Sequence, residues 1–213
     1  IHILSNTYTM RHLIYITLCL FGLATTAQST ILINNVVIFN GKDEKTITGN
    51  VLVVNNLIQK ISTSPIPTNK SGNTVIIDGK GKFLMPGLID AHWHAILTAS
   101  TMNELMYAEP GYVFIKAGDE AANTLMRGFT SVRDLGGPSF GLKKAIDDGV
   151  IDGPRIWPSG SIISQTSGHG DFRSVNERPV SLGGCLHHSE EIGGATIADG
   201  KDAVLVAVRE NLK

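Results

Sequence analysis

Residues 83–94 contain the most informative pattern of the chain, Phe83-Leu84-Met85-Pro86-Gly87-Leu88-Ile89-Asp90-Ala91-His92-Trp93-His94. Proline has no N–H to donate to a sheet, so Pro86 followed by Gly87 ends one group of strands and marks a boundary. The residues after Gly87 predict a new strand. The end of that strand carries two histidines separated by one residue.

Alternate side chains of a strand share a face, so His92 and His94 are expected to project the same way and to donate ring nitrogens to one cation. Neutral imidazoles suit a borderline ion such as zinc. The same alternation places Asp90 one step below His92, where its carboxylate could orient an imidazole. It turns Trp93 toward packing. Spacing alone also fits a histidine pair at a solvated strand end.

Residues 30–86 contain short runs rich in β-branched residues, separated by the turn formers Asn34-Asn35, Asn40-Gly41 and Asn55-Asn56. They predict a small antiparallel β unit that ends before Pro86. The runs are 31–33, 36–39, 51–54, 57–61, 75–78 and 82–85.

Beyond Pro86 the pattern alternates between strand and helix, which implies parallel strands with crossover helices. Doubly wound sheets and closed eight-stranded barrels both show this alternation, and periodicity alone does not separate them. Strands are predicted at 88–91, 130–133 and 155–159, and helices before Gly128, between Pro138 and Gly149, and over 202–213. One face of the first helix carries Ala117, Ala121, Leu125 and Met126, and one face of the last carries Ala203, Val204, Ala207, Val208 and Leu212.

The stretch 83–94 resembles the signature of the amidohydrolase superfamily, whose first barrel strand carries a pair of metal-binding histidines. Residues 128–137 and 153–156 look like the second and third barrel strands of its imidazolonepropionase-like branch, which includes Xaa-Pro dipeptidase-like enzymes. The resemblance covers roughly residues 30–213. It implies an α/β chain in which 87–213 form the first, incomplete part of a (β/α)8 TIM-like barrel and 30–86 supply strands of a small β-sandwich.

The resemblance also implies that His92 and His94 are metal ligands, with zinc as the expected metal and one or two ions bound. In two-metal members of the branch, a lysine carrying a carboxylate, two later histidines and an aspartate complete the site. Lys213 closes a helix and does not match that lysine, and none of the other residues is assigned in this chain.

A glycine-flanked histidine follows the third predicted strand in Ser167-Gly168-His169-Gly170-Asp171-Phe172. Active sites gather in such loops, and glycines let the backbone approach a ligand closely. His169 is therefore a candidate substrate-binding residue that could polarise a scissile carbonyl, with Asp171 holding the loop. A purely structural turn is the alternative.

Other polar residues are expected to be structural. Arg133 and Asp134 could face the barrel mouth, but an internal ion pair or strand-end hydrogen bonds would explain them as well, and the structural interpretation is favoured. His187-His188 lies among Gly183-Gly184 and acidic residues, which favours an exposed loop over a second metal site. The sequence contains no glycine-rich phosphate loop or paired-cysteine zinc motif.

The N-terminal segment 10–27 is predicted to be a signal peptide, because an apolar run follows Arg11 and small residues end at Ala27. An uncleaved N-terminal anchor is the alternative. Residues 1–9 precede the first plausible start and are expected to be non-structural upstream sequence. The mature protein is expected to be exported, periplasmic or extracellular, without a stable membrane span.

Composition limits the partners. The formal net charge of −1 gives no overall attraction to nucleic acid or anionic membranes. Cys19 lies in the predicted signal peptide, which leaves Cys185 alone and excludes a disulfide framework.

The predicted reaction is hydrolysis of a C–N bond, amide or peptide-like, in a small molecule or dipeptide, with water activated by a metal ion. A TIM barrel typically needs about 250 residues, so the chain is expected to be an N-terminal fragment that is inactive alone. Two alternatives stay open: a mononuclear deaminase of the same superfamily, and a non-catalytic barrel that only binds.

Overall fold

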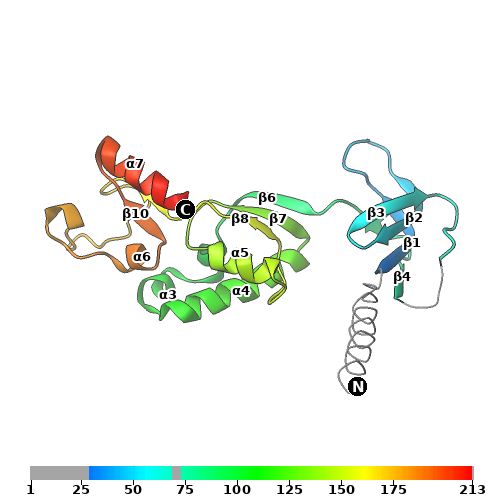
Figure 1. The fold of residues 1–213 in the computed structure, drawn as a ribbon, viewed down its shortest axis with the longest axis horizontal. Coiled ribbons are helices and arrows are strands. Elements are labelled where there is room, and N and C mark those ends of the chain that lie inside the picture. Colours follow the sequence, from blue (N-terminus) through cyan, green and yellow to red (C-terminus); the bar gives the residue numbers. More distant parts are fainter. Residues whose placement is uncertain (1–28, 69–72, 213) are drawn as a thin grey trace, which may run out of the picture. The chain divides into compact units, whose positions relative to one another are not determined.

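The computed structural model describes residues 29–68 and 73–212, which divide after Pro86 into two compact units (Figure 1). The predicted signal peptide, 10–27, and the segment 1–9 lie outside the described residues. Among the helices of the described residues, none is long and apolar enough to cross a membrane.

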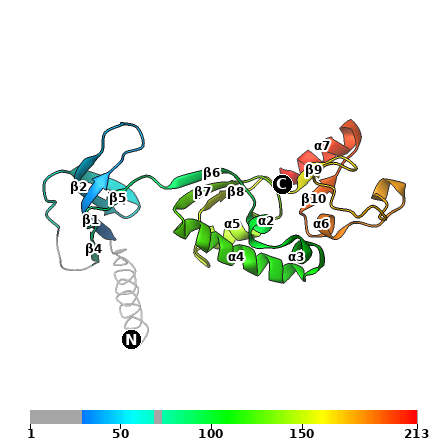
Figure 2. The ribbon, with the colours of Figure 1, turned by 180° about the vertical axis from the view of Figure 1, so that it is seen from behind.

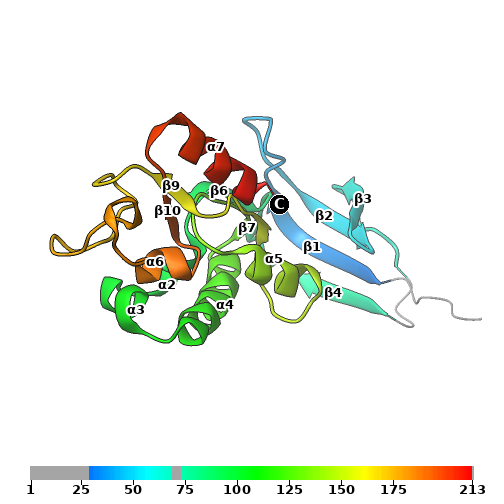
Figure 3. The same ribbon diagram turned by 60° about the vertical axis from the view of Figure 1, so that its left-hand side comes forward.

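The first unit is a mixed five-stranded sheet (Figure 3). The first three strands pair in antiparallel fashion in the order β3-β2-β1, whereas β4 and β5 both pair with β1 in parallel. The antiparallel prediction is therefore right for three strands and wrong for the last two. The connection from β3 to β4 is long enough to carry the chain back along the sheet, as parallel pairing requires. The strands are β1 (Thr30–Ile38), β2 (Ile47–Val54), β3 (Leu57–Ser62), β4 (Thr74–Asp78) and β5 (Phe83–Leu84).

Strand β1 joins two runs that the sequence predicts as separate strands. The prediction of a turn at Asn34-Asn35 is therefore wrong. The register with β2 shifts between Ile33 and Val36, and the N–H of Asn35 donates to Oδ1 of Asn50 at 3.2 Å. Asn35 has a φ of 55°, a left-handed conformation that asparagine tolerates. The pair therefore forms a β-bulge inside one strand.

The turn predicted at Asn55-Asn56 is confirmed. It joins β2 to β3, with Val54 paired to Leu57 and Asn55 at a φ of 56°. The buried apolar side chains of this sheet are Leu32, Val36, Ile38 and Val51. The described residues of the unit form one sheet, and the β-sandwich that the resemblance implies stays a prediction.

The second unit begins with a parallel sheet in the order β6-β7-β8 (Figure 2), as the alternating pattern predicts. Helices connect successive strands. Closure of this sheet into a barrel stays a prediction. The elements are β6 (Leu88–Trp93), α2 (Ala95–Ala99), α3 (Met102–Tyr107), α4 (Pro110–Met126), β7 (Phe129–Asp134), α5 (Phe140–Asp147) and β8 (Arg155–Trp157).

The core of this sheet lies between the strands and α4. Trp93 is buried against Ala121, Val132 and Ile156, which confirms that it turns toward packing. The predicted apolar face of α4 is correct at Ala121 but wrong at Met126, which is 85% exposed. Met126 is the last residue of the helix and lies beyond its buried stripe.

The remaining elements follow β8. The strands β9 and β10 pair in parallel, and with three residues each they are too short to show periodicity in the sequence. In the last helix only Ala207 of the predicted apolar face is buried, while Val204 and Val208 are each about two-fifths exposed. The elements are β9 (Ile162–Ser164), η2 (Val180–Leu182), α6 (His188–Glu191), β10 (Ala195–Ile197) and α7 (Gly200–Asn211).

Candidate active site

The two histidines of the sequence pattern lie at the carboxyl end of β6. His94 directly precedes α2 in an extended conformation, and its carbonyl accepts the N–H and the hydroxyl of Thr98 at 3.0 and 2.8 Å. The N–H of Leu135 donates to the Trp93 carbonyl at 2.9 Å and ties this end of β6 to the chain after β7. The imidazole centroids of His92 and His94 are 5.2 Å apart, with the rings inclined at 70°.

Asp90 contacts the main chain of the histidine pair. Its Oδ1 accepts the backbone N–H of His92 at 2.9 Å. The register between β6 and β7 also shifts between Asp90 and Trp93, so β6 contains an extra residue there and simple alternation of faces does not hold. The carboxylate thus fixes the strand next to the rings, and its orientation of an imidazole stays a prediction.

His92, His94 and His169 line one hollow of about 610 Å³, called the histidine hollow below. His169 comes from the turn after β9, far from β6 in the sequence. Most of the other lining side chains are apolar, as in many ligand-binding clefts. The remaining lining residues are Leu97, Ser100, Met102, Leu105, Leu135, Ile162 and Phe172.

The histidine pair fits a divalent cation chemically. Nδ1 of His94 is buried without a hydrogen-bond partner, an arrangement that costs free energy unless another ligand is present. Two neutral imidazoles suit a borderline ion such as zinc. Within 29–68 and 73–212, no three His, Cys, Asp or Glu side chains come together as a complete metal site.

Asp134 is fully buried at the end of β7. Burial raises the pKa of its carboxyl, while the Ser139 side chain, the backbone N–H groups of Gly136 and Ala95 and the His94 ring act against this. Its Oδ2 has no hydrogen-bond partner.

Arg133, which precedes Asp134 in β7, is exposed and donates long hydrogen bonds, at 3.5 Å, to the carbonyls of Trp157 and Pro158. Strand-end hydrogen bonds, one of the two structural interpretations of Arg133, are therefore confirmed.

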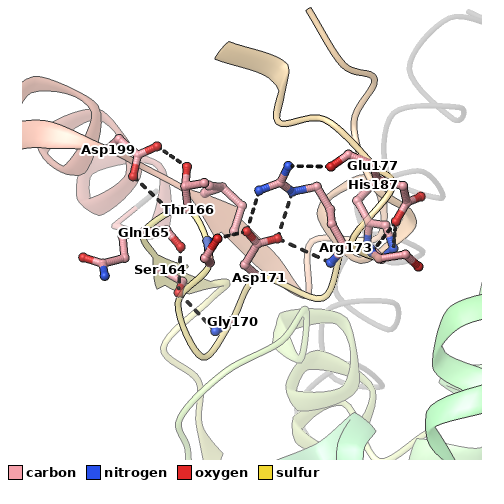
Figure 4. A network of polar contacts seen from close by, with 12 residues as sticks. Ser164, Gln165, Thr166, Gly170, Asp171, Arg173, Glu177, His187 and Asp199 are labelled. Atoms are coloured by element: carbon pink, nitrogen blue, oxygen red, sulfur yellow. Dashed lines mark hydrogen bonds and ion pairs between the residues drawn. The ribbon is translucent and has the colours of Figure 1, made fainter. Parts of the chain in front are cut away.

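The turn that carries His169 is held by a network of polar contacts (Figure 4). Asp171 accepts the N–H of Ser167 at 2.7 Å and forms an ion pair with Arg173. Hydrogen bonding to Arg173 holds the pKa of the Asp171 carboxyl below its usual value. The expectation that Asp171 holds this loop is confirmed.

The two glycines around His169 bring the backbone close to β9. A Cβ on Gly168 would lie 2.5 Å from Oγ of Ser164, and one on Gly170 would lie 2.7 Å from Cγ2 of Ile162. The glycines are predicted from the sequence to allow close approach of a ligand. In the described structure they allow close packing of the turn on the strand, and the side chain of His169 remains exposed.

The exposed loop expected at His187-His188 is wrong, because His187 is 7% exposed and the partly buried His188 begins α6. His187 precedes α6, and its Nδ1 accepts the N–H of Ser189 at 3.2 Å while Glu190 bonds back to the His187 N–H. The ring replaces the usual Ser or Thr of a capping box, which explains its burial. His188 lies 3.9 Å from a Glu191 oxygen, outside the histidine hollow.

Two polar residues of this region have no distinct sequence pattern. Arg173 follows Asp171 by two residues in an irregular loop, and Asp199 reaches Thr166 from 33 residues away. Only the folded loop brings them together, so neither can be identified from spacing.

Comparison with known proteins gives consistent matches. The model of the amidohydrolase family matches residues 83–213. Ochratoxinase from Aspergillus niger is 36% identical over 138 residues, covering 61% of this chain and 28% of that enzyme. A 5'-deoxyadenosine deaminase from Methanobrevibacter smithii is 39% identical over 71 residues, covering 33% and 16%. A crystal structure of a prolidase complexed with N-methylphosphonate-L-proline has a TM-score of 0.72 at 30% identity, covering 86% of this chain and 44% of that one. The chain thus spans less than half the length of each of these proteins.

Proposed function

The chain belongs to the amidohydrolase family, and from this premise we propose that its protein hydrolyses a C–N bond, amide or peptide-like, with a divalent ion held in part by His92 and His94. The observation that carries the proposal is the convergence of His92, His94 and His169 on one hollow at the end of a parallel strand. In α/β folds, ligands bind at the carboxyl ends of parallel strands.

Each residue of the hollow has a distinct part in the proposal. The rings of His92 and His94 hold the ion, and Asp90 fixes the main chain of His92 through its 2.9 Å hydrogen bond. A divalent ion supplies Lewis-acid chemistry that lets water attack an amide at neutral pH. His169 donates a hydrogen bond to the substrate carbonyl. The apolar lining, including Leu97 and Phe172, excludes bulk water and accepts an apolar substrate group.

The proposed substrate is a dipeptide or another small amide. The similar structure of a prolidase complexed with N-methylphosphonate-L-proline supports this class. A mononuclear deaminase is the second candidate, because a 5'-deoxyadenosine deaminase matches part of the chain. The products separate the two: a deaminase releases ammonia from an amino-substituted ring, whereas an amidase releases an amine and a carboxylate. A non-catalytic binding barrel would give neither product.

The architecture proposed for the whole protein is a (β/α)8 barrel, with residues 30–86 contributing to a β-sandwich. The remaining ligands of one or two zinc ions are proposed to come from barrel strands that this chain does not include. The basis is that relatives of this family are more than twice as long as the part matched here. The 213-residue chain alone is then expected to be inactive.

Export is proposed from the sequence of residues 10–27. N-terminal sequencing of the protein recovered from outside the cytoplasm should begin at Gln28, after cleavage behind Ala27. A mature protein that still begins at Met10 would contradict a cleaved signal peptide.

The experiment that tests the function is metal analysis of the complete protein together with product analysis on a panel of dipeptides and acylated amino acids. The double variant His92→Ala, His94→Ala should lose bound zinc and activity. His188→Ala is the matched control, because that histidine lies outside the histidine hollow. Unchanged metal stoichiometry in the double variant would refute the assignment.

A further inference from the structure

We infer that Arg173 is a positioning residue of the candidate active site, because its buried ion pair with Asp171 sets where His169 stands in the histidine hollow. The inference rests on the proposed function, since the position of His169 affects turnover only if the hollow binds substrate. Arg173 itself does not line that hollow.

The ion pair is bidentate and buried. Nε of Arg173 donates to Oδ1 of Asp171 at 2.8 Å, and Nη2 donates to Oδ2 at 2.5 Å. The two side chains are 7% and 5% exposed. Nη1 of Arg173 donates to the Glu177 carbonyl at 3.3 Å, so the guanidinium is also fixed from a third direction. The guanidinium group is planar, and two parallel hydrogen bonds to one carboxylate fix its orientation.

Asp171 transmits this orientation to the His169 turn. Its Oδ2 also accepts the N–H of Ser167 at 2.7 Å, and its own N–H donates to the Gly168 carbonyl at 3.0 Å. The backbone just before His169 is therefore held by Asp171, through its carboxylate at Ser167 and through its main-chain N–H at Gly168. Ser167 has a φ of 59°, a left-handed conformation that serine rarely adopts without such support.

Two further contacts, which do not involve Arg173 or Asp171, hold the turn before and after His169. The N–H of Thr166 donates to Oδ1 of Asp199 at 2.9 Å, and its hydroxyl bonds to the other oxygen of that carboxylate. The N–H of Gly170 donates to Oγ of Ser164 at 3.0 Å. The exposed residue His169 therefore lies in a turn whose backbone is held before and after it. Figure 4 shows the contacts of Thr166, Gly170 and Asp171.

The chemistry of the pair favours positioning over bulk stability. Taking two charges out of water offsets much of their attraction, so a buried ion pair is a weak source of stability. The ion pairs Lys143–Asp147 and Lys144–Asp148 on α5 are far more exposed and impose no fixed loop geometry. A desolvated, bidentate pair next to a substrate-facing histidine instead holds that histidine in place.

A double-mutant cycle in the complete protein tests the inference. Arg173→Ala and His169→Ala should each lower kcat/KM on a dipeptide substrate by about 10²-fold, with zinc content unchanged. The combined variant should be no slower than His169→Ala alone, because Arg173 acts through His169. Multiplicative losses would overturn the inference. Arg127→Ala is the control, since it removes an arginine–glutamate pair from α4, outside the hollow.

Hydrogen exchange gives a readout that does not depend on activity. Arg173→Ala should speed exchange of the amides of Ser167 and Asp171, whose hydrogen bonds depend on the place of Asp171. Unchanged protection of these amides would overturn the inference even in an enzyme with no detectable turnover. If the wild-type protein binds no zinc and shows no turnover, that result counts against the proposed function but not against the positioning of His169 by Arg173. If Arg173→Ala does not fold, Arg173→Lys is used in its place. Lysine keeps the positive charge but cannot form the bidentate pair. Wild-type turnover and wild-type amide protection in Arg173→Lys would overturn the inference.

Discussion

Replacing Gly170 by alanine should push the His169 turn away from β9. A Cβ at this position would lie 2.7 Å from Cγ2 of Ile162 and 3.0 Å from Cβ of Ser164. Carbon atoms in contact normally lie about 3.5–4.0 Å apart, so the turn and the strand must separate by roughly 0.5–1 Å. Ser164 cannot rotate away freely, because its Oγ accepts the Gly170 N–H. Ile162 is fixed in β9 by pairing with Ala195.

Two measurable losses follow from this displacement. Overpacking of this size costs about 1–3 kcal/mol of unfolding free energy. A substrate-contacting group displaced by about 1 Å can lose on the order of 10²-fold in turnover. Urea unfolding should therefore give a lower midpoint for Gly170→Ala, and steady-state kinetics of the complete enzyme should give a lower kcat/KM.

Gly141→Ala provides the matched control for this substitution. Gly141 lies in α5, and a Cβ there meets nothing within 4 Å. Alanine is favoured over glycine in a helix, so the control should gain about 0.5–1 kcal/mol. If Gly170→Ala unfolds at the wild-type midpoint and turns over substrate at the wild-type rate, the turn does not depend on close packing against β9 and the reasoning is refuted.

Two further predictions concern α3, at the rim of the histidine hollow. Thr101 and Glu104 form a capping box at its start, so Thr101→Ala should lower the unfolding free energy by about 1 kcal/mol in urea titrations, and no change would show that the cap is dispensable. Hydrogen bonding from Lys116, helped by the Thr101 N–H, lowers the pKa of Glu104 from 4.5 to about 2. Because the folded state holds the charged form more strongly, this contribution is complete above about pH 4.5 and is lost as the pH falls toward 2. Comparing unfolding free energies at pH 6 and pH 3 should therefore show a smaller acid loss in Glu104→Gln than in the wild type, and equal losses would contradict the assignment.

The histidine pair could be located from the sequence because its spacing, the preceding Pro86-Gly87 and the following helix are all local features. The detailed role of Asp90 could not be predicted. An extra residue in β6 relative to β7 changes which side chains share a face, and this bulge depends on the pairing partner. His169 was identifiable as a candidate from its flanking glycines, but its place in the same hollow as His92 depends on the path of the chain after β8.

Most strands of both units could also be predicted, as could the parallel pairing of the second sheet, but the parallel pairing of β4 and β5 with β1 could not. The runs that became β1, β2 and β3 are marked by β-branched residues, but nothing local indicates that β4 returns parallel to β1. Asn34-Asn35 and Asn55-Asn56 have similar composition, yet one pair forms a bulge and the other a turn. The burial of His187 likewise depends on capping α6, a function usually served by serine or threonine.

The connections within the two sheets also set an order of folding. Strands β2 and β3 are joined by the two-residue turn Asn55-Asn56, and such hairpins close within microseconds. Strand β6 pairs with β7 only after α2, α3 and α4 have brought the chain around, which is a slower, non-local closure. A newly made chain therefore has its first hairpin before His92 and His94 gain a neighbouring strand. Binding of the ion before the site has formed would have to supply the free energy that orders the chain. Loading with the ion should therefore follow the assembly of the second unit.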